Sequence, residues 1–405
     1  MEICYVKFIS PVYCYAGYVT DAGTKQYIFS WIFLLVVSIG FIKALFGRDR
    51  FWKYVSCILL CLKFVPLTIL IAYVPYPMDY IVRNFVFWFF FIGLYNALPF
   101  FKIIGKNTID RNRKLIDNII NYVAILFTIA VFYVSIRYTG FHLQTDLFDV
   151  YDIRMEQRTQ SYPILFSYIL ASSTLLCPLI LCYFLDKKKN VLSVFFVFVV
   201  FLDFSIGGLK SIVFTTVLAL LFRWLYSPKI LYYIPLLASI AILPIFVVGE
   251  VIQLGISFVL WRALFIPSGM DFEYYTFFNI FEPDYYRNSI FSRFGAESPY
   301  ANSAVDIAVG EYFSPGIEGI RANNGLISEA FANFGLAGYL IFPIILVLYI
   351  KLISSCAKYT SEAYLTLIAL IFTYTIISTF IPATFLSSGV IYMIFFLIVY
   401  SKKTV

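Results

Sequence analysis

Apolar runs of about 20 residues alternate with short polar segments along almost the whole chain. A helix needs roughly 20 predominantly apolar residues to cross the hydrocarbon core of a bilayer. The pattern therefore predicts an all-α polytopic membrane protein with 11 or 12 transmembrane helices. Residues 3–19 form the twelfth and weakest run, because Lys7 and Pro11 interrupt it. The other predicted spans are 28–46, 51–74, 80–100, 116–137, 162–184, 190–206, 210–226, 229–250, 335–353, 363–381 and 384–400.

Composition and charge support this class and give the chain an orientation. The sequence is 61% hydrophobic and 13% charged, whereas soluble domains are about 45–50% apolar and about 25% charged. Its net charge of +7 is carried by alternate connecting segments, as orientation in a membrane requires, and does not indicate nucleic-acid binding. By the positive-inside rule these segments and the C-terminus are cytoplasmic. They hold 17 of the 30 lysines and arginines and comprise 47–53, 101–114, 186–190, 223–229, 351–358 and 401–403.

Two long polar segments fall on the opposite face, at 138–161 and 251–334. The second is much longer than a connection needs, and such segments are usually functional. Its apolar and aromatic content predicts amphipathic helices packed on the outer membrane surface. We therefore divide the chain into transmembrane helices over 1–250, which include the short loop 138–161, a loop subdomain over 251–334, and C-terminal transmembrane helices over 335–405.

The stretch "FVLWRALFIPSGMDFEYYTFF" at 258–278 places Arg262 directly after an apolar run. The Ile-Pro-Ser-Gly sequence that follows predicts a turn that bends the chain back over the membrane. Acids then alternate with aromatics, as in carbohydrate sites where sugar faces stack on rings. We interpret Arg262 as a ligand for an anionic substrate, because guanidinium presents a fork of donors suited to phosphate. The alternative is an anchor at the membrane surface.

Two further groups of cations are candidates for the same anion. Lys210 stands in "FSIGGLKSIVF", where the glycine pair predicts a break between two apolar runs, with a helix N-terminus pointing at an anion. The alternative for Lys210 is snorkelling to the outer surface. Arg154 and Arg158 are four residues apart in the first loop and would share one face of a helix. The alternative for these two arginines is a solvated face of ion pairs with neighbouring acids.

The segment "NNGLISEAFANFGLAG" closes the second loop and begins the next apolar run. Asn323 and Asn324 stand at the start of an expected helix, and a helix N-cap is the alternative function for Asn323. Glu329 follows near the membrane edge, where a carboxylate can act as a general base. We expect no metal: "DFE" at 271–273 is only a near-match to a D-x-D motif, and Cys57 and Cys61 have no histidine partner.

Four motifs in this order, "VYDIR", "GGLKS", "WRALFIPSG" with "YYTFF", and "NNGLISEAFANFGLAG", resemble the bacterial O-antigen and polysaccharide repeat-unit polymerases of the Wzy type. The resemblance covers most of the chain and implies a GT-C-like architecture in the bacterial inner membrane, with the active site facing the periplasm. It implies transfer of a growing glycan from undecaprenyl diphosphate to the non-reducing end of another lipid-linked repeat unit, without metal or cofactor. Donor, acceptor, bilayer and a chain-length regulator would be the partners.

The resemblance also implies site residues. The related O-antigen ligases often have a His-Asn pair where this chain has Asn323-Asn324, which counts against a ligase, and Lys210 replaces a common arginine. A ligase remains one alternative, and a lipid-linked glycan flippase is another. A flippase would need charges deep within helices of both halves. The expected catalytic residues are Arg262, Lys210, Glu329 and Glu273, and the expected substrate-binding residues are Arg154, Arg158, Tyr274, Tyr275, Arg287, Arg321, Asn323 and Asn324.

Overall fold

The computed structural model describes residues 1–99, 101, 106–143, 162–225, 242–300 and 303–399, with 233, 236–237 and 239–240. The chain is 79% helical, and these residues contain no β-strand, so the all-α prediction is confirmed. The chain divides into two compact units. Unit 1 comprises Met1–Phe101, Lys229–Ser354 and Thr373–Ile381, and unit 2 comprises Lys102–Pro228, Ser355–Phe372 and Pro382–Val405.

Seven of the described helices are long and apolar enough to cross a membrane, or eight if one bent pair counts as a single span. A multi-pass membrane protein is therefore the class that the structure supports. Two shorter apolar helices, Lys210–Leu221 and Tyr364–Ser378, accompany them. The seven are Thr24–Phe46, Arg50–Tyr73, Met78–Ala97, Lys114–Tyr138, Asn190–Gly207, Glu250–Ile280 and Ile327–Ala357.

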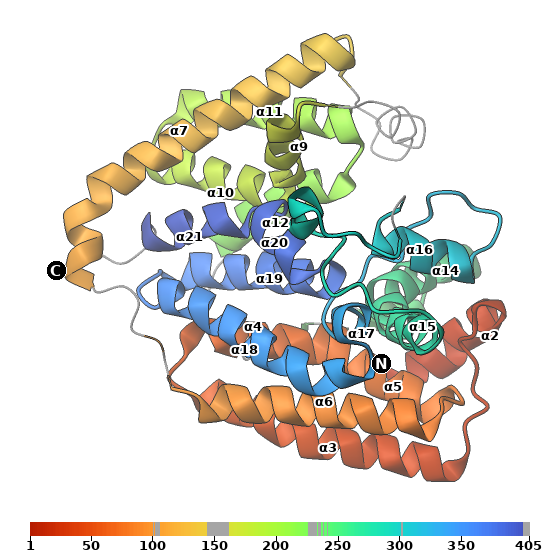
Figure 1. The fold of residues 1–405 in the computed structure, drawn as a ribbon. Helices are drawn as coiled ribbons and strands as arrows, with labels where there is room; N and C mark the ends of the chain where they lie inside the picture. The colour runs from red at the N-terminus through yellow and green to blue at the C-terminus, as the bar shows by residue number, and fades with distance from the viewer. Residues whose placement is uncertain are drawn as a thin grey trace. The chain divides into compact units, whose positions relative to one another are not determined.

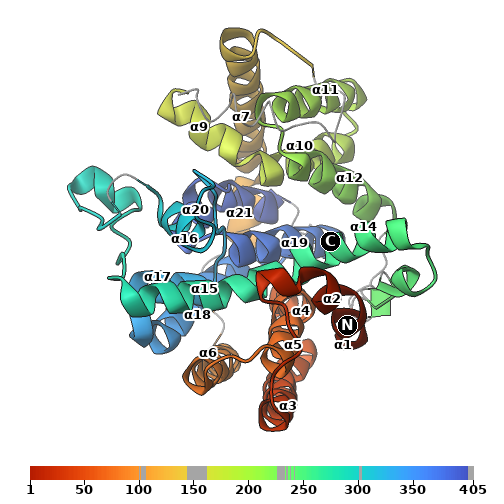
Figure 2. The ribbon, with the colours of Figure 1, turned by 90° about the vertical axis from the view of Figure 1, so that its right-hand side faces the viewer.

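Unit 1 is built on N-terminal helices and on helices from the later segment Lys229–Ser354 (Figures 1 and 2). In its N-terminal part, short turns α1, η1, α2 and η2 over residues 2–16 precede α3 (Thr24–Phe46), the continuous run α4 (Arg50–Leu59), η3 (Leu60–Phe64) and α5 (Val65–Tyr73), and α6 (Met78–Ala97). Its later part contains η4 (Leu243–Phe246), α14 (Glu250–Leu260), η5 (Trp261–Phe265), α15 (Ile266–Ile280), η6 (Ile290–Phe294), α16 (Val305–Phe313), α17 (Ile327–Phe334), η7 (Gly335–Ala337) and most of α18 (Gly338–Ala357).

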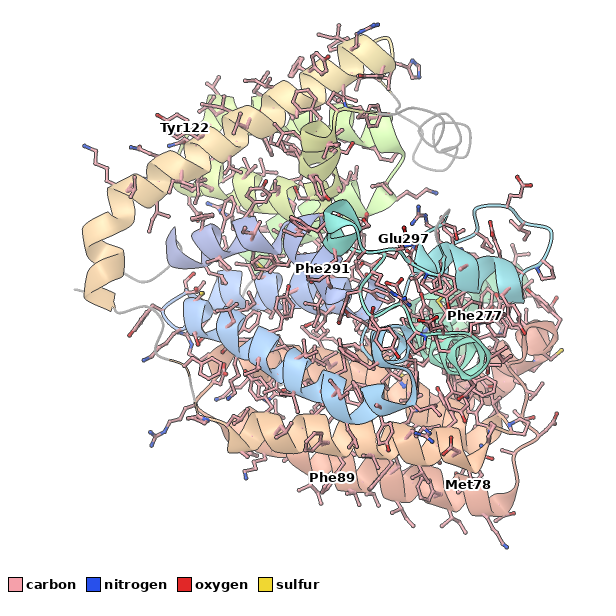
Figure 3. All side chains as sticks on the ribbon, in the orientation of Figure 1. Met78, Phe89, Tyr122, Phe277, Phe291 and Glu297 are labelled. Atoms are coloured by element: carbon pink, nitrogen blue, oxygen red, sulfur yellow. The ribbon has the colours of Figure 1, made fainter. Side chains whose placement is uncertain are left out.

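The run from α4 to α5 lies at the centre of unit 1, since most of its residues are buried, whereas only a minority of the residues of α3 are buried. Phe64 forms the middle of an aromatic core, with ring centroids 5.1 Å from Phe33 and 5.2 Å from Trp88. Close packing of α3 on α6 requires Gly40, because a Cβ there would lie 2.2 Å from Ile92. The exposed side chains of the outer helices are largely apolar, as a lipid-facing surface requires. Phe89 of α6 is an example (Figure 3).

Unit 2 contains α7 (Lys106–Tyr138), α9 (Ile164–Ala171), α10 (Ser173–Asp186), α11 (Asn190–Gly207), α12 (Lys210–Leu225), the first part of α19 (Glu362–Ser378), most of α20 (Ile381–Leu386) and α21 (Val390–Val399). Helix α10 packs on α12, and the Thr215 hydroxyl donates to the Thr174 carbonyl across that contact at 3.0 Å. The predicted break between α11 and α12 is confirmed. Gly208 adopts φ 58° there, a left-handed conformation that ends α11.

The structure departs from the predicted spans in several places. The span expected at 162–184 is bent by 67° between α9 and α10, and that expected at 384–400 is divided into α20 and α21. The helical run expected to begin at 335 begins with α17 at Ile327. Within the weak span predicted at 3–19, four contiguous helical elements of different type, α1 to η2, end at Ala16. Eight of the 22 residues of the span predicted at 229–250 lie outside the described residues, and its last part contains η4 and the first residue of α14.

Candidate functional site

Arg262 lies in η5, a π-helical turn that joins α14 to α15 in one helical run from Glu250 to Ile280. The turn predicted at Ile-Pro-Ser-Gly is therefore wrong, because these four residues are the first turn of α15. Pro267, which has no N–H donor, directly follows the π-helical turn, where the regular hydrogen-bond pattern of the run changes. Single π-helical turns inside longer helices occur frequently at functional sites.

The Arg262 side chain is exposed, and its guanidinium lies 5.9 Å from the centroid of the Phe258 ring. Among the described residues, no carboxylate lies within ion-pair distance of it. The other two predicted arginines of this unit are neutralised by carboxylates. Arg287 pairs with Glu282 at 2.8 Å, and Arg321 pairs with Asp306 at 3.0 Å. Arg262 is thus the site cation of unit 1 whose charge is available for an anion.

A second charged centre lies inside the helices of unit 1. Lys63, in the π-helical turn η3, is fully buried, and its ammonium lies 2.8 Å from the carboxylate of Asp271, which is also fully buried. The ammonium also donates to the Pro267 carbonyl at 2.5 Å. The turns η3 and η5 pack against each other. The site residues predicted from the sequence do not include this pair. The sequence feature that could have indicated it is a lysine within an apolar run.

Asn324 and Ser328 connect this ion pair to the segment that begins α17. The Asn324 amide donates to Asp271 Oδ1 at 3.0 Å and to the Pro267 carbonyl at 2.7 Å. The Ser328 hydroxyl donates to the same Asp271 oxygen at 2.9 Å. Asn324 is therefore a buried structural partner of Asp271. Asn323, in contrast, is exposed and lies outside α17, so its alternative function as the N-cap of this helix is wrong.

Glu329 is buried in the first turn of α17, with 1% of its surface exposed. Its Oε1 accepts a hydrogen bond from the Tyr286 hydroxyl at 2.9 Å. The backbone N–H of Ile381 donates to both carboxylate oxygens, at 2.8 and 2.9 Å. Helix α17 lies beside α15 (Figures 1 and 2). The carboxylate is thus held in one orientation by donors from two separate segments.

Tyr286 reaches Glu329 from a strained loop. Tyr285 and Tyr286 adopt φ values of 51° and 60°, which are unfavourable for residues with a side chain. The Asn333 side chain stabilises this conformation by accepting the Tyr286 N–H at 2.7 Å. Burial, and then the charge and hydrogen bonding of Glu329, raise the pKa of the Tyr286 phenol well above its usual value. The half-buried Tyr286 therefore stays protonated and covers the carboxylate.

The remaining predicted residues of α15 are placed differently from one another. Tyr274 is fully buried and donates to the Ala322 carbonyl at 2.9 Å, and the Tyr275 hydroxyl donates to Asp79 at 2.8 Å. Tyr274 thus holds the backbone at Ala322 against α15, and Tyr275 holds α6 against the same helix. Glu273, which directly precedes these two tyrosines in the sequence, is half-buried.

The other predicted site cations belong to unit 2. Lys210 is the first residue of α12 and is exposed. Arg154 and Arg158 lie outside the described residues. In the part of the chain that the structure covers, no three histidine, cysteine, aspartate or glutamate side chains are grouped to hold a metal ion.

Comparisons with known proteins add no relative to this picture. The chain matches no family model, no curated protein and no solved structure.

Proposed function

We propose that this protein is a membrane glycosyltransferase that polymerises oligosaccharide repeat units carried on undecaprenyl diphosphate. In this proposal the protein lies in a bacterial inner membrane with its site facing the periplasm, and its C-terminus lies in the cytoplasm. The observation that carries the proposal is the exposed Arg262, uncompensated among described residues, in a unit where Arg287 and Arg321 are neutralised. The order of the four sequence motifs supports the same assignment.

The reaction requires a cation for the leaving group. A hydroxyl oxygen of the acceptor sugar attacks the anomeric carbon of the growing glycan, the bond from that carbon to the diphosphate oxygen breaks, and the lipid diphosphate leaves. Negative charge therefore builds on phosphate oxygens in the transition state. A preorganised donor at such a position contributes about 100-fold to 1,000-fold in rate. Arg262 is the proposed donor. Lys210, Arg154 and Arg158 belong to unit 2 and are proposed as a separate set of cations that bind substrate phosphate.

The acceptor hydroxyl also needs a partner for its proton. Glu329 is the proposed base, because its carboxylate already accepts a hydrogen bond from a hydroxyl, that of Tyr286, at 2.9 Å. A sugar hydroxyl that displaced Tyr286 would find the same oxygen held in place by the Ile381 N–H. Glu273 is the second candidate for this role.

The test uses purified protein in lipid nanodiscs with synthetic undecaprenyl-diphosphate repeat units and EDTA. Wild type is expected to yield a ladder of glycans, and Arg262→Ala is expected to lose it. Arg223→Ala is the matched control, because it removes an exposed arginine that Asp186 neutralises and that is not a proposed site residue. A ladder from Arg262→Ala equal to that of the control would remove Arg262 from the site. No ladder from wild type with any repeat unit would overturn the proposed function.

A lipid-linked glycan transporter is the second candidate, favoured by the buried Lys63–Asp271 pair, since charges within membrane helices commonly mark transport pathways. Reconstituted vesicles separate the two activities. A transporter would move a fluorescent lipid-linked repeat unit between leaflets without elongating it, whereas a polymerase would elongate it.

A further inference from the structure

The Lys63–Asp271 pair is difficult to explain by stability alone. Both side chains are fully buried, and removing two charges from water costs about as much as, or more than, their attraction returns. Apolar residues of similar volume often serve equally well in such positions. A role in fixing the position of neighbouring segments would explain why a charged pair is present.

The hydrogen bonds of the pair converge on the two elements that carry the proposed catalytic groups. The Pro267 carbonyl, in the first turn after η5, accepts from both Lys63 and Asn324, at 2.5 and 2.7 Å. Asp271 accepts from Ser328, at 2.9 Å, and Ser328 directly precedes Glu329 in α17. One network thus touches the chain just after Arg262 and just before Glu329.

The connection between Asn324 and Ser328 is itself rigid. A Cβ on Gly325 would lie 2.2 Å from the Ile376 carbonyl oxygen, and the Gly325 N–H donates to the Ile377 carbonyl at 2.8 Å. Leu326 adopts φ 55°, which is strained for a residue with a side chain. Such strain persists only where the surrounding contacts over-determine the conformation. The network supplies these contacts on one side of the turn.

We infer that Lys63, Asp271, Asn324 and Ser328 are positioning residues that fix the Arg262 turn relative to the Glu329 helix; the inference rests on the proposed glycosyl transfer. In this role they act through Arg262 and Glu329, and Asn324, which the sequence predicted to bind substrate, instead donates to Asp271 and Pro267. They hold the cation for the leaving group and the carboxylate for the acceptor hydroxyl at a constant separation, and displacements of about 1 Å commonly cost 100-fold in rate.

The first variant is Ser328→Ala, which removes one donor to Asp271 and leaves the ion pair intact. The control is Ser257→Ala, a buried serine of α14 whose hydroxyl donates to the Leu254 carbonyl of its own helix. We expect kcat of Ser328→Ala to fall by about tenfold, with KM and Tm equal to those of the control. Equal kcat in the two variants would overturn the inference.

The second variant replaces both charges, Lys63→Met with Asp271→Leu. We expect it to fold with a Tm near that of wild type and to show a reduced kcat at unchanged KM. A merely structural pair would instead leave kcat unchanged once folding is restored. Full activity of this double variant would therefore also overturn the inference.

An activity-independent measurement separates this inference from the proposed function. Hydrogen exchange followed by mass spectrometry reports the amides of 326–334 and of the peptide that contains Ile381. We expect about tenfold faster exchange there in Ser328→Ala than in Ser257→Ala, at equal Tm. This result with an inactive wild type would refute glycosyl transfer while retaining the positioning network. Unchanged exchange would refute the network.

Discussion

The role of Glu329 can be tested by replacing it with glutamine, which preserves the shape of the side chain and removes its charge. The carboxylate accepts from the Tyr286 hydroxyl at 2.9 Å and from the Ile381 N–H at 2.8 and 2.9 Å. The amide oxygen of glutamine can accept from both donors. Glu329→Gln therefore keeps the contacts that hold α17, but it can no longer take a proton.

The effects on stability and rate are expected to differ strongly. Each charge-assisted hydrogen bond that becomes neutral costs about 1 kcal/mol, and no longer burying a charge offsets part of this loss. The Tm should then stay within about 5 °C of wild type. A general base contributes about 100-fold to 10,000-fold, so kcat for elongation of lipid-linked repeat units should fall by that factor.

The control is Glu329→Ala, which leaves the Tyr286 hydroxyl and the Ile381 N–H without their acceptor. Each buried donor without a partner costs about 1–3 kcal/mol, so this variant should lose stability as well as rate. The competing view is that Glu329 only holds the start of α20 through the Ile381 N–H. A kcat for Glu329→Gln within threefold of wild type would establish that view and refute the assignment as base.

Three further outcomes follow from the packing of unit 1. Lys63→Met leaves Asp271 buried without its cation and should lower the free energy of unfolding by about 3–5 kcal/mol. Adding Asp271→Leu should restore the stability in thermal unfolding assays, and equal Tm values for the single and the double variant would contradict this. Gly325→Ala places a Cβ 2.2 Å from a carbonyl oxygen and should cost about 1–3 kcal/mol or more, whereas Gly249→Ala, with open space around it, should be near neutral by the same assay. The pKa of the Tyr286 phenol is raised by burial and by the nearby carboxylate. The contribution of the protonated phenol to the free energy of unfolding is therefore complete below about pH 10 and is lost as pH rises through the folded-state pKa. The free energy of unfolding should fall more steeply at alkaline pH for wild type than for Tyr286→Phe, and parallel curves would oppose this prediction.

The sequence was sufficient to predict several of the long helices, because lipid requires an unbroken apolar stretch, but the helical run Glu250–Ile280 lies in the segment that was expected to be an outer loop. The span predicted at 28–46 is the helix Thr24–Phe46, and that predicted at 51–74 is the helical run Arg50–Tyr73. The bend after Ala171 was missed because hydropathy does not report direction. The helix through Pro267 was missed because proline and glycine usually indicate turns, and here a π-helical turn precedes them.

The candidate site was only partly predictable for a related reason. Glu329 and Arg262 stand out because each is charged beside an apolar run. Lys63 interrupts an apolar run and Asp271 belongs to the "DFE" sequence, and only the folded structure brings them within 2.8 Å of each other. Asn323 and Asn324 are indistinguishable by type, yet one is exposed and the other buried against Asp271. Pairing across the chain has no local signature.

The long separation of the partners of Lys63 in the sequence has a consequence for biosynthesis. Its hydrogen bond to Pro267 joins residues 204 positions apart, so ribosomes finish the Lys63 helix long before Asp271 emerges. A lone lysine at the centre of an inserting helix costs about 2.5–3.5 kcal/mol, which apolar neighbours can outweigh at about 0.3–0.6 kcal/mol each. The nascent helix can therefore enter the bilayer early but reaches its final neighbours late. Assembly of unit 1 is consequently a post-insertion step that waits for the Glu250–Ile280 run.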